Sequence, residues 1–133
     1  MRTTPENITS LEENEIFVFG SNLSGIHGAG AAHTARQWGA LMGKGTGIQG
    51  KTYAIPTKDR LIKTLSIKAI DRHVGVFINY ARKHSDKKFL VTKIGCGLAN
   101  LQVSDMAPLF KNALELENVY LPIEFIEFLN SNR

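Results

Sequence analysis

Cysteine, long apolar runs and acidic residues are all scarce in this chain, and each scarcity excludes classes of protein. Cys96 is the only cysteine among 133 residues, so an internal disulfide is excluded and a thiolate zinc site lacks its partners. The histidines are not spaced from Cys96 as metal ligands would be, so no metal is expected. No apolar run approaches about 18 residues, and the first residues lack the apolar centre of a signal peptide. We therefore expect a cytoplasmic chain without membrane contact.

Acidic residues are scarcest in the middle of the chain. Residues 44–93 hold twelve Lys and Arg against three Asp and Glu, whereas the segments on either side are net negative, within a formal charge of +4. A local excess of positive charge attracts anionic partners such as nucleic acid. A solvated protein surface explains the same excess equally well, so both interpretations stay open.

The order of apolar segments predicts one domain, residues 1–133, of the α/β class. The length and the 43% hydrophobic content suit a single compact core. Ser66 is expected to cap the clearest helix, and Ser104 to cap a later one that runs from residue 105 to about 116. Strands alternating with helices predict an α/β sandwich with a mostly parallel or mixed sheet. Strands are expected at 15–20, 52–56, 88–94 and 118–122, helices at 29–38, 66–83 and 123–129, and a turn-rich connection at 40–50.

Two glycine-rich loops each lie between a predicted strand and a predicted helix. They cover residues 20–32 and 94–100. In open α/β sheets, ligands bind where strands end and loops enter helices, and small residues let the backbone approach a phosphate closely. A diphosphate with flanking sugars can use both loops. The spacing matches neither a Walker P-loop nor the Rossmann fingerprint, which argues against a kinase, an ATPase or a dehydrogenase.

Three segments together resemble the ligand-binding segments of macrodomains, in the same order along the chain. They are IFVFGSNLSGIHGAGAA, YAIPTKD and VTKIGCGLANLQVSDMAPLF, and the resemblance covers roughly residues 15–122. It is greatest to the branch that includes the terminal ADP-ribose protein glycohydrolases. The resemblance implies a three-layer α/β/α fold with a mixed central sheet, whose two loops wrap the diphosphate and distal ribose of ADP-ribose. It implies no tightly held cofactor.

The resemblance also implies roles for individual residues. Lys58 is similar to the lysine that attacks the ribose C1″ in the glycohydrolase branch, and Asn22 to an asparagine near the distal ribose. Ala99 stands where that branch has its acidic partner, so Asp59 or Asp105 would have to transfer the proton. The candidate catalytic residues are therefore Lys58, Asn22 and Asp59. The candidate ligand-binding residues are Gly20, Ser21, Asn22, Gly25, His27, Gly28, Ala29, Gly30, Ala31, Thr57, Gly95, Cys96, Gly97, Leu98 and Ala99.

Each of these residues also has a plain structural interpretation. Lys58 can be a surface lysine, and Asn22 a turn residue. Cys96 can be a small loop thiol, and His27 an exposed loop histidine. Three functions stay open. The first is binding of an ADP-ribose derivative, with hydrolysis of ADP-ribosyl groups or of ADP-ribose 1″-phosphate. The second is a non-catalytic module for RNA or poly(ADP-ribose), and the third is a structural or phage-type accessory domain with a vestigial pocket.

Overall fold

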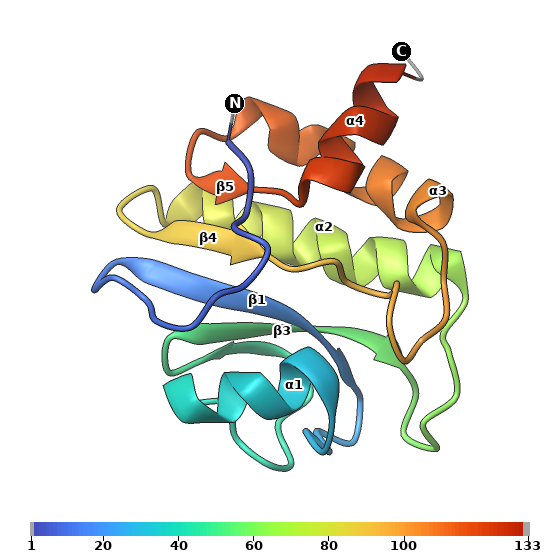
Figure 1. Cartoon of the computed structure of the whole chain (residues 1–133). Coiled ribbons are helices and arrows are strands. Elements are labelled where there is room, and N and C mark those ends of the chain that lie inside the picture. Colours follow the sequence, from blue (N-terminus) through green and yellow to red (C-terminus); the bar gives the residue numbers. More distant parts are fainter. Residues whose placement is uncertain (1, 132–133) are drawn as a thin grey trace.

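A five-stranded mixed sheet with helices on both faces forms the protein, and the computed structural model describes residues 2–131 (Figure 1). This confirms the expected α/β class. The strands are β1 (Glu15–Asn22), β2 (Gly47–Gln49), β3 (Thr52–Lys58), β4 (Lys88–Val91) and β5 (Val119–Tyr120). The helices are α1 (Gly30–Ala35), α2 (Ile67–Lys83), α3 (Val103–Met106) and α4 (Ile123–Ser131), with 3-10 helices η1 (Arg36–Trp38) and η2 (Ala107–Glu115).

The central strand of the sheet is β1, in the order β2-β3-β1-β4-β5. It pairs in parallel with β3 on one side and with β4 on the other, and β5 continues in parallel beside β4. Only β2 runs antiparallel, at the edge beside β3. The carboxyl ends of β1, β3 and β4 therefore meet at one edge of the sheet.

Alternate side chains of β1 enter two separate apolar cores, one on each face of the sheet. Ile16 and Val18 pack with α2, η2 and α4, whereas Phe17 and Phe19 pack with α1. This alternation follows from the two-residue period of a strand. Residues 16–19 are therefore apolar on both faces of the strand, as expected for a strand covered on both sides.

Two helix-capping residues were predicted, and one of them was wrong. Ser66 caps α2 as expected, because its side chain accepts a hydrogen bond from the Ala69 N–H at 3.2 Å. Ser104 lies inside α3, whose cap is instead Gln102 in a reciprocal capping box with Asp105. The predicted helix over 105–116 is a short α3 followed by η2, which has a proline at its start. Proline lacks the N–H that would continue the α-helical hydrogen bonds.

The connection at 40–50 contains the short strand β2, which the sequence did not predict. The buried Gln49 holds this region together, since its Oε1 accepts from the Leu41 N–H at 2.7 Å and its Nε2 donates to the Lys44 carbonyl at 3.0 Å. A three-residue strand that begins with glycine has no periodic signal of its own. Its pairing with β3 decides its conformation.

Candidate functional site

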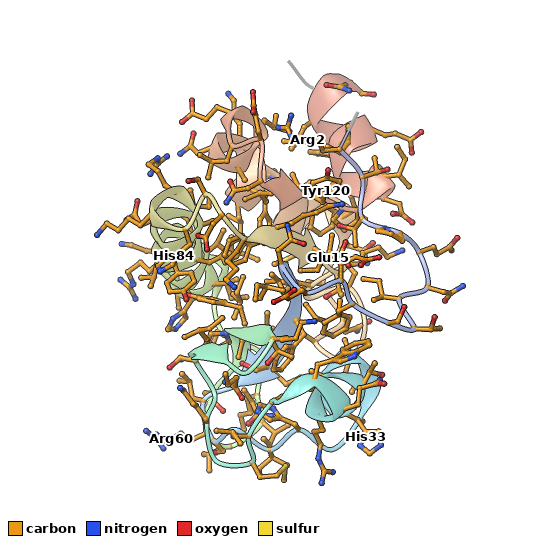
Figure 2. The ribbon with its side chains drawn as sticks, turned by 90° about the vertical axis from the view of Figure 1, so that its left-hand side faces the viewer. Arg2, Glu15, His33, Arg60, His84 and Tyr120 are labelled. Atoms are coloured by element: carbon orange, nitrogen blue, oxygen red, sulfur yellow. The ribbon has the colours of Figure 1, made fainter. Side chains whose placement is uncertain are left out.

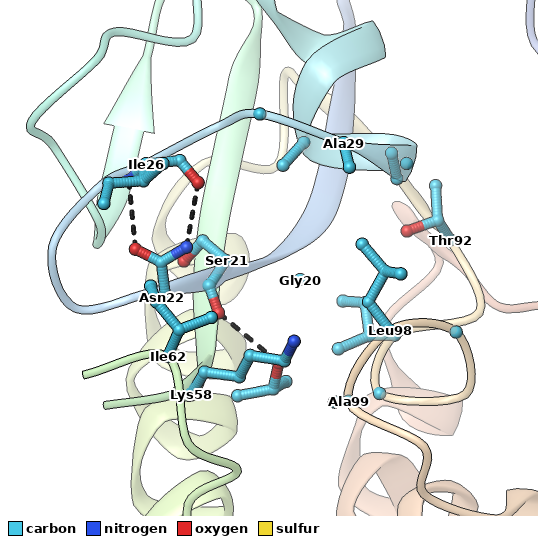
Figure 3. Close-up of a pocket in the computed structure, with 18 of the residues that line it drawn as sticks. Gly20, Ser21, Asn22, Ile26, Ala29, Lys58, Ile62, Thr92, Leu98 and Ala99 are labelled. Atoms are coloured by element: carbon cyan, nitrogen blue, oxygen red, sulfur yellow. Dashed lines mark hydrogen bonds between the residues drawn. The ribbon is translucent and has the colours of Figure 1, made fainter. Parts of the chain in front are cut away.

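A cavity of about 570 Å³ opens at the edge of the sheet where β1, β3 and β4 end (Figure 3). The loop after β1 leads to α1 on one face, while the segments after β3 and β4 lead to α2 and α3 on the other face. Such a divergence of neighbouring loops opens a crevice for ligands in α/β sheets. The lining residues are Gly20, Ser21, Asn22, Ile26, Gly28, Ala29, Gly30, Ala31, Ala32, Thr57, Lys58, Ile62, Thr92, Lys93, Ile94, Gly95, Gly97, Leu98 and Ala99.

The loop after β1 is shaped by its own polar and glycine residues. The side-chain amide of Asn22 donates to the Ile26 carbonyl at 2.8 Å and accepts from the Ile26 N–H at 3.0 Å (Figure 3). Gly25 has a φ of +70°, and a Cβ there would overlap the backbone at Gly43 and Lys44. Asn22 lines the cavity, but both ends of its amide are engaged in holding the turn. Gly25 supports the loop from outside the cavity.

The loop after β4 contains two glycines with different tasks. Gly95 has a φ of +82°, and a Cβ on it would lie 2.9 Å from the sulfur of Met106. The loop closes behind it, since the Leu101 N–H donates to the Gly95 carbonyl at 2.7 Å. A Cβ on Gly97, in contrast, would meet no atom within 4 Å. Gly97 therefore leaves open space at the cavity surface, whereas Gly95 is required by the fold.

The charges at the cavity surface are positive. Lys58 and Lys93 line it, and no Asp or Glu of residues 2–131 does so. Figure 3 shows the Lys58 ammonium group pointing into the space between the two glycine loops. Lys93 also lies 3.4 Å from a carboxylate oxygen of Glu124, outside the cavity. The site is suited to an anionic ligand, because two cations line it and only Lys93 shares its charge with a carboxylate, that of Glu124.

Four of the predicted site residues do not line the cavity. One is Gly25, and a second is Cys96, where burial raises the pKa of the thiol and so disfavours the reactive thiolate. His27 is fully buried, with Nε2 3.0 Å from the Lys44 carbonyl and its ring edge against Phe19. The interpretation of His27 as an exposed loop histidine was wrong, because the loop turns this ring into the core. The alternative, a ligand contact, has no support either, since His27 does not line the cavity.

The fourth is Asp59, whose carboxylate is used within its own turn. Its Oδ1 accepts hydrogen bonds from the Leu61 N–H at 2.8 Å and the Lys63 N–H at 3.0 Å. Asp105, the other candidate proton donor, accepts from the Gln102 N–H at 2.9 Å and does not line the cavity either. Ala99 does line the cavity, and neither of these two acids lies beside it there.

Sequence reasoning missed several lining residues. Thr92, Lys93 and Ile94 directly precede Gly95, and a strand end beside a glycine loop is a signal that could have identified them. Ile26 and Ala32 lie inside the first loop region, but apolar residues there carried no chemical signal. Ile62 comes from the turn after β3 and could not be found by any local pattern.

A second cavity of about 480 Å³ adjoins the first. The two cavities share Ala31, Thr92 and Lys93 in their linings. The second one lies under the N-terminal segment, residues 4–9, and beside the start of α4 at Ile123 and Glu124. The two cavities therefore adjoin at Ala31, Thr92 and Lys93.

Comparison of the chain with protein-family models, with curated proteins and with solved structures found no match in any of the three. None of the helices within residues 2–131 has the length and apolar character needed to cross a lipid bilayer. In that same part of the chain, no three His, Cys, Asp or Glu side chains gather closely enough to hold a metal ion.

Proposed function

We propose that the protein is a macrodomain-like module that binds ADP-ribose or a derivative of it, with the diphosphate between the loops at 20–32 and 94–100. One observation carries this proposal: segments about seventy residues apart meet at one cavity, which Lys58 and Lys93 line and which no carboxylate of residues 2–131 lines. Glycine and alanine at positions 28–31 leave the backbone accessible to a phosphate. The volume of about 570 Å³ lies within the usual range for small-ligand sites.

The adjoining cavities suit the elongated shape of such a ligand. In this proposal the distal ribose lies beside Asn22 and Lys58, and the adenosine end extends past Lys93 toward the second cavity. Lys93 then lies between the two ends, near the diphosphate, where its positive charge attracts the phosphate oxygens. Glu6 and Glu124, in the second cavity, offer carboxylates that can accept hydrogen bonds from an exocyclic amino group.

Hydrolysis of an ADP-ribosyl linkage is the catalytic extension of this proposal. Lys58 is the candidate nucleophile at the ribose C1″, and it can attack only in its neutral form. No acidic side chain of the described residues lines the cavity to protonate the leaving group. We therefore expect weak turnover at most, on ADP-ribosyl groups or on ADP-ribose 1″-phosphate. If Lys58 is not the nucleophile, a water molecule held by the loops is the remaining one.

Isothermal titration calorimetry with ADP-ribose tests the binding. Gly97→Val should leave the fold intact, since its Cβ meets nothing, but should place a branched side chain in the ligand's path and weaken binding at least about tenfold. Gly75→Ala is the matched control, because Gly75 lies on α2 with open space around it and away from the cavity. Unchanged affinity of a folded Gly97→Val protein, or no binding by the unaltered protein, would contradict the proposal.

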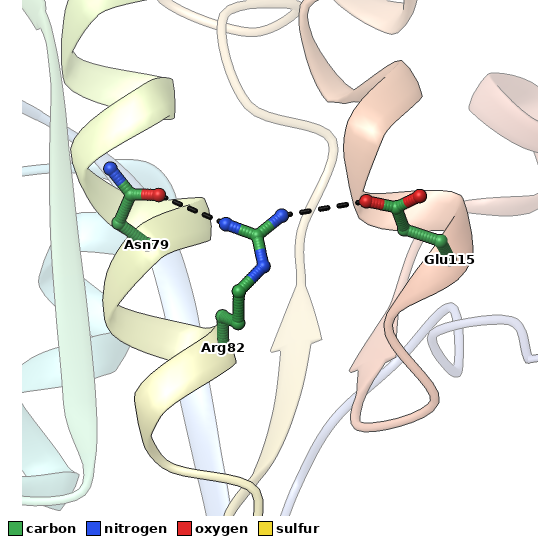
Figure 4. Close-up of polar contacts among 3 residues, drawn as sticks. All are labelled: Asn79, Arg82 and Glu115. Carbon is green, nitrogen blue, oxygen red and sulfur yellow. Dashed lines mark hydrogen bonds and ion pairs between the residues drawn. The ribbon is translucent and has the colours of Figure 1, made fainter.

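An RNA or poly(ADP-ribose) module is the second candidate, and the exposed cations of residues 44–93 favour it. Lys68 and Arg72 are exposed one turn apart on α2, and Arg60 lies at the periphery of the protein (Figure 2). Arg82 is less available, since it contacts Asn79 at 3.0 Å and Glu115 at 3.5 Å (Figure 4).

The two candidates differ in their response to salt and to charge reversal. RNA affinity should fall steeply with salt, whereas a diphosphate held by backbone N–H groups should be less sensitive. Lys68→Glu with Arg72→Glu should weaken RNA binding and leave ADP-ribose affinity unchanged. Lys88 is unsuited to this test, because it pairs with Glu15 at 3.5 Å and lies over the Tyr120 ring. Loss of both affinities together would show a single site.

A further inference from the structure

The mouth of the cavity carries large aliphatic side chains that the rest of residues 2–131 leaves exposed. Ile26, Ile62 and Leu98 line it, and 51%, 41% and 68% of these residues, respectively, remain exposed to solvent. Figure 3 shows Ile26 and Ile62 on the side of Asn22 and Lys58, and Leu98 on the opposite side. Two apolar walls thus face each other across the opening. Neither the diphosphate nor a ribose explains them, since both are polar.

Ile62 is held in a backbone conformation that a β-branched residue rarely adopts. Its φ is +63°, in the left-handed region, where glycine and asparagine are the usual residues. The turn around it is closed from both sides: the Ile62 N–H donates to the Asp59 carbonyl at 3.1 Å, and the Asp59 N–H to the Lys63 carbonyl at 2.7 Å. Strain of this kind at the edge of a site points to a task for the side chain.

The position of these walls indicates what they contact. Ile26 and Ile62 lie at the end of the cavity where Lys58 and Asn22 stand, which is the distal ribose end under the proposed function, and Leu98 faces them across the opening. A group attached to that ribose would leave the cavity between Leu98 and the two isoleucines. A slot between facing aliphatic surfaces fits a flat ring, which buries apolar area on both of its faces. Lys58 at the base of the slot disfavours a cationic ring.

We infer that the site selects a dinucleotide whose terminal ribose carries an uncharged planar ring over one that ends in a free ribose. The inference rests on the proposed function. Ile62 and Leu98 are specificity-determining residues in this arrangement: their side chains contact the ring, while the backbone of the glycine loops contacts the diphosphate. The strained turn at 59–63 keeps Ile62 at the opening.

Two ligands that differ only at this end test the inference. ADP-ribose ends in a free ribose, and NADH carries an uncharged dihydronicotinamide ring at the same carbon. Calorimetry should show NADH binding about tenfold more tightly than ADP-ribose, the effect expected from burying roughly 60 Å² of apolar ring surface. Equal affinity, or tighter binding of ADP-ribose, would overturn the inference while leaving the proposed function standing. No binding of either ligand would overturn both.

Substitution of Ile62 separates the ring contact from the diphosphate contact. Ile62→Asn suits the left-handed backbone and removes the apolar wall, so the ratio of the NADH affinity to the ADP-ribose affinity should fall from about ten to about one. Relief of strain should also raise the melting temperature, which shows that the variant is folded. Leu61→Asn is the matched control, since Leu61 lies in the same turn, is 76% exposed and does not line the cavity. A preference that survives Ile62→Asn, or is lost equally with Leu61→Asn, would refute the role of Ile62.

Discussion

The two glycines on either side of Cys96 should differ in their response to substitution by alanine: Gly95→Ala should destabilise the fold, whereas Gly97→Ala should leave its stability nearly unchanged. In Gly95→Ala, the backbone of the new alanine must keep a φ of +82°, which lowers the free energy of unfolding by about 1–2 kcal/mol. It would also lie 2.9 Å from the sulfur of the fully buried Met106, and overpacking of this kind costs about 1–3 kcal/mol. Two effects offset part of this loss. The flexible Met106 side chain can move away in part, and alanine loses less chain entropy than glycine on folding, which stabilises the protein by about 0.4–1 kcal/mol. The net expectation is a loss of about 2–3 kcal/mol.

Gly97→Ala lacks both penalties. Its Cβ meets no atom within 4 Å and its backbone lies outside the left-handed region, so stability should change by no more than about 0.5 kcal/mol or rise slightly. Thermal and urea unfolding followed by circular dichroism measure the difference. For a chain of this size, Gly95→Ala should melt about 10 °C lower and Gly97→Ala near the unaltered protein. Equal destabilisation by both variants would refute the division of tasks in this loop.

Two other predictions concern Lys58 and the pH dependence of stability. If Lys58 attacks the ribose, borohydride should trap a covalent lysine adduct with ADP-ribose; Lys58→Ala should then abolish trapping and turnover, and Ala99→Asp should raise the rate. Robust turnover by Lys58→Ala would exclude the lysine mechanism, and trapping that survives it would point to another lysine. Burial raises the pKa of Tyr53 from 10.0 to about 12, so the unfolded chain ionises first as pH rises. The contribution of Tyr53 to the free energy of unfolding is therefore fully present below pH 10, and about 2–3 kcal/mol of it should be lost by pH 12. Urea unfolding at pH 9 and pH 11.5 measures this loss, which should be absent in Tyr53→Phe. If the variant loses as much unfolding free energy between the two pH values as the unaltered protein, the role of Tyr53 is contradicted.

Local patterns carried the positions of most helices and strands. The apolar period of residues 67–81, with Ser66 before it, located α2, because helix capping and amphipathicity involve residues within a few positions of each other. The apolar run at 15–20 located β1, which extends to Asn22. The prediction that Ser104 caps a helix was wrong because a reciprocal Gln102–Asp105 pair caps α3 instead. The strand β2 was not predicted because its conformation depends on pairing with β3.

The sequence by itself determined the α/β class and the two glycine loops, since strand period, helix caps and glycine-rich turns are encoded within short windows. Only the tertiary structure decided which of those loop residues share a cavity. It placed Gly97 and Gly28 in the lining of the same cavity and buried His27 in the core. It also placed the Asp59 carboxylate where it holds the turn that positions Ile62 at the opening. These outcomes depend on the pairing of β1 with β3 and β4, contacts between residues far apart in the chain, and no local pattern contains them.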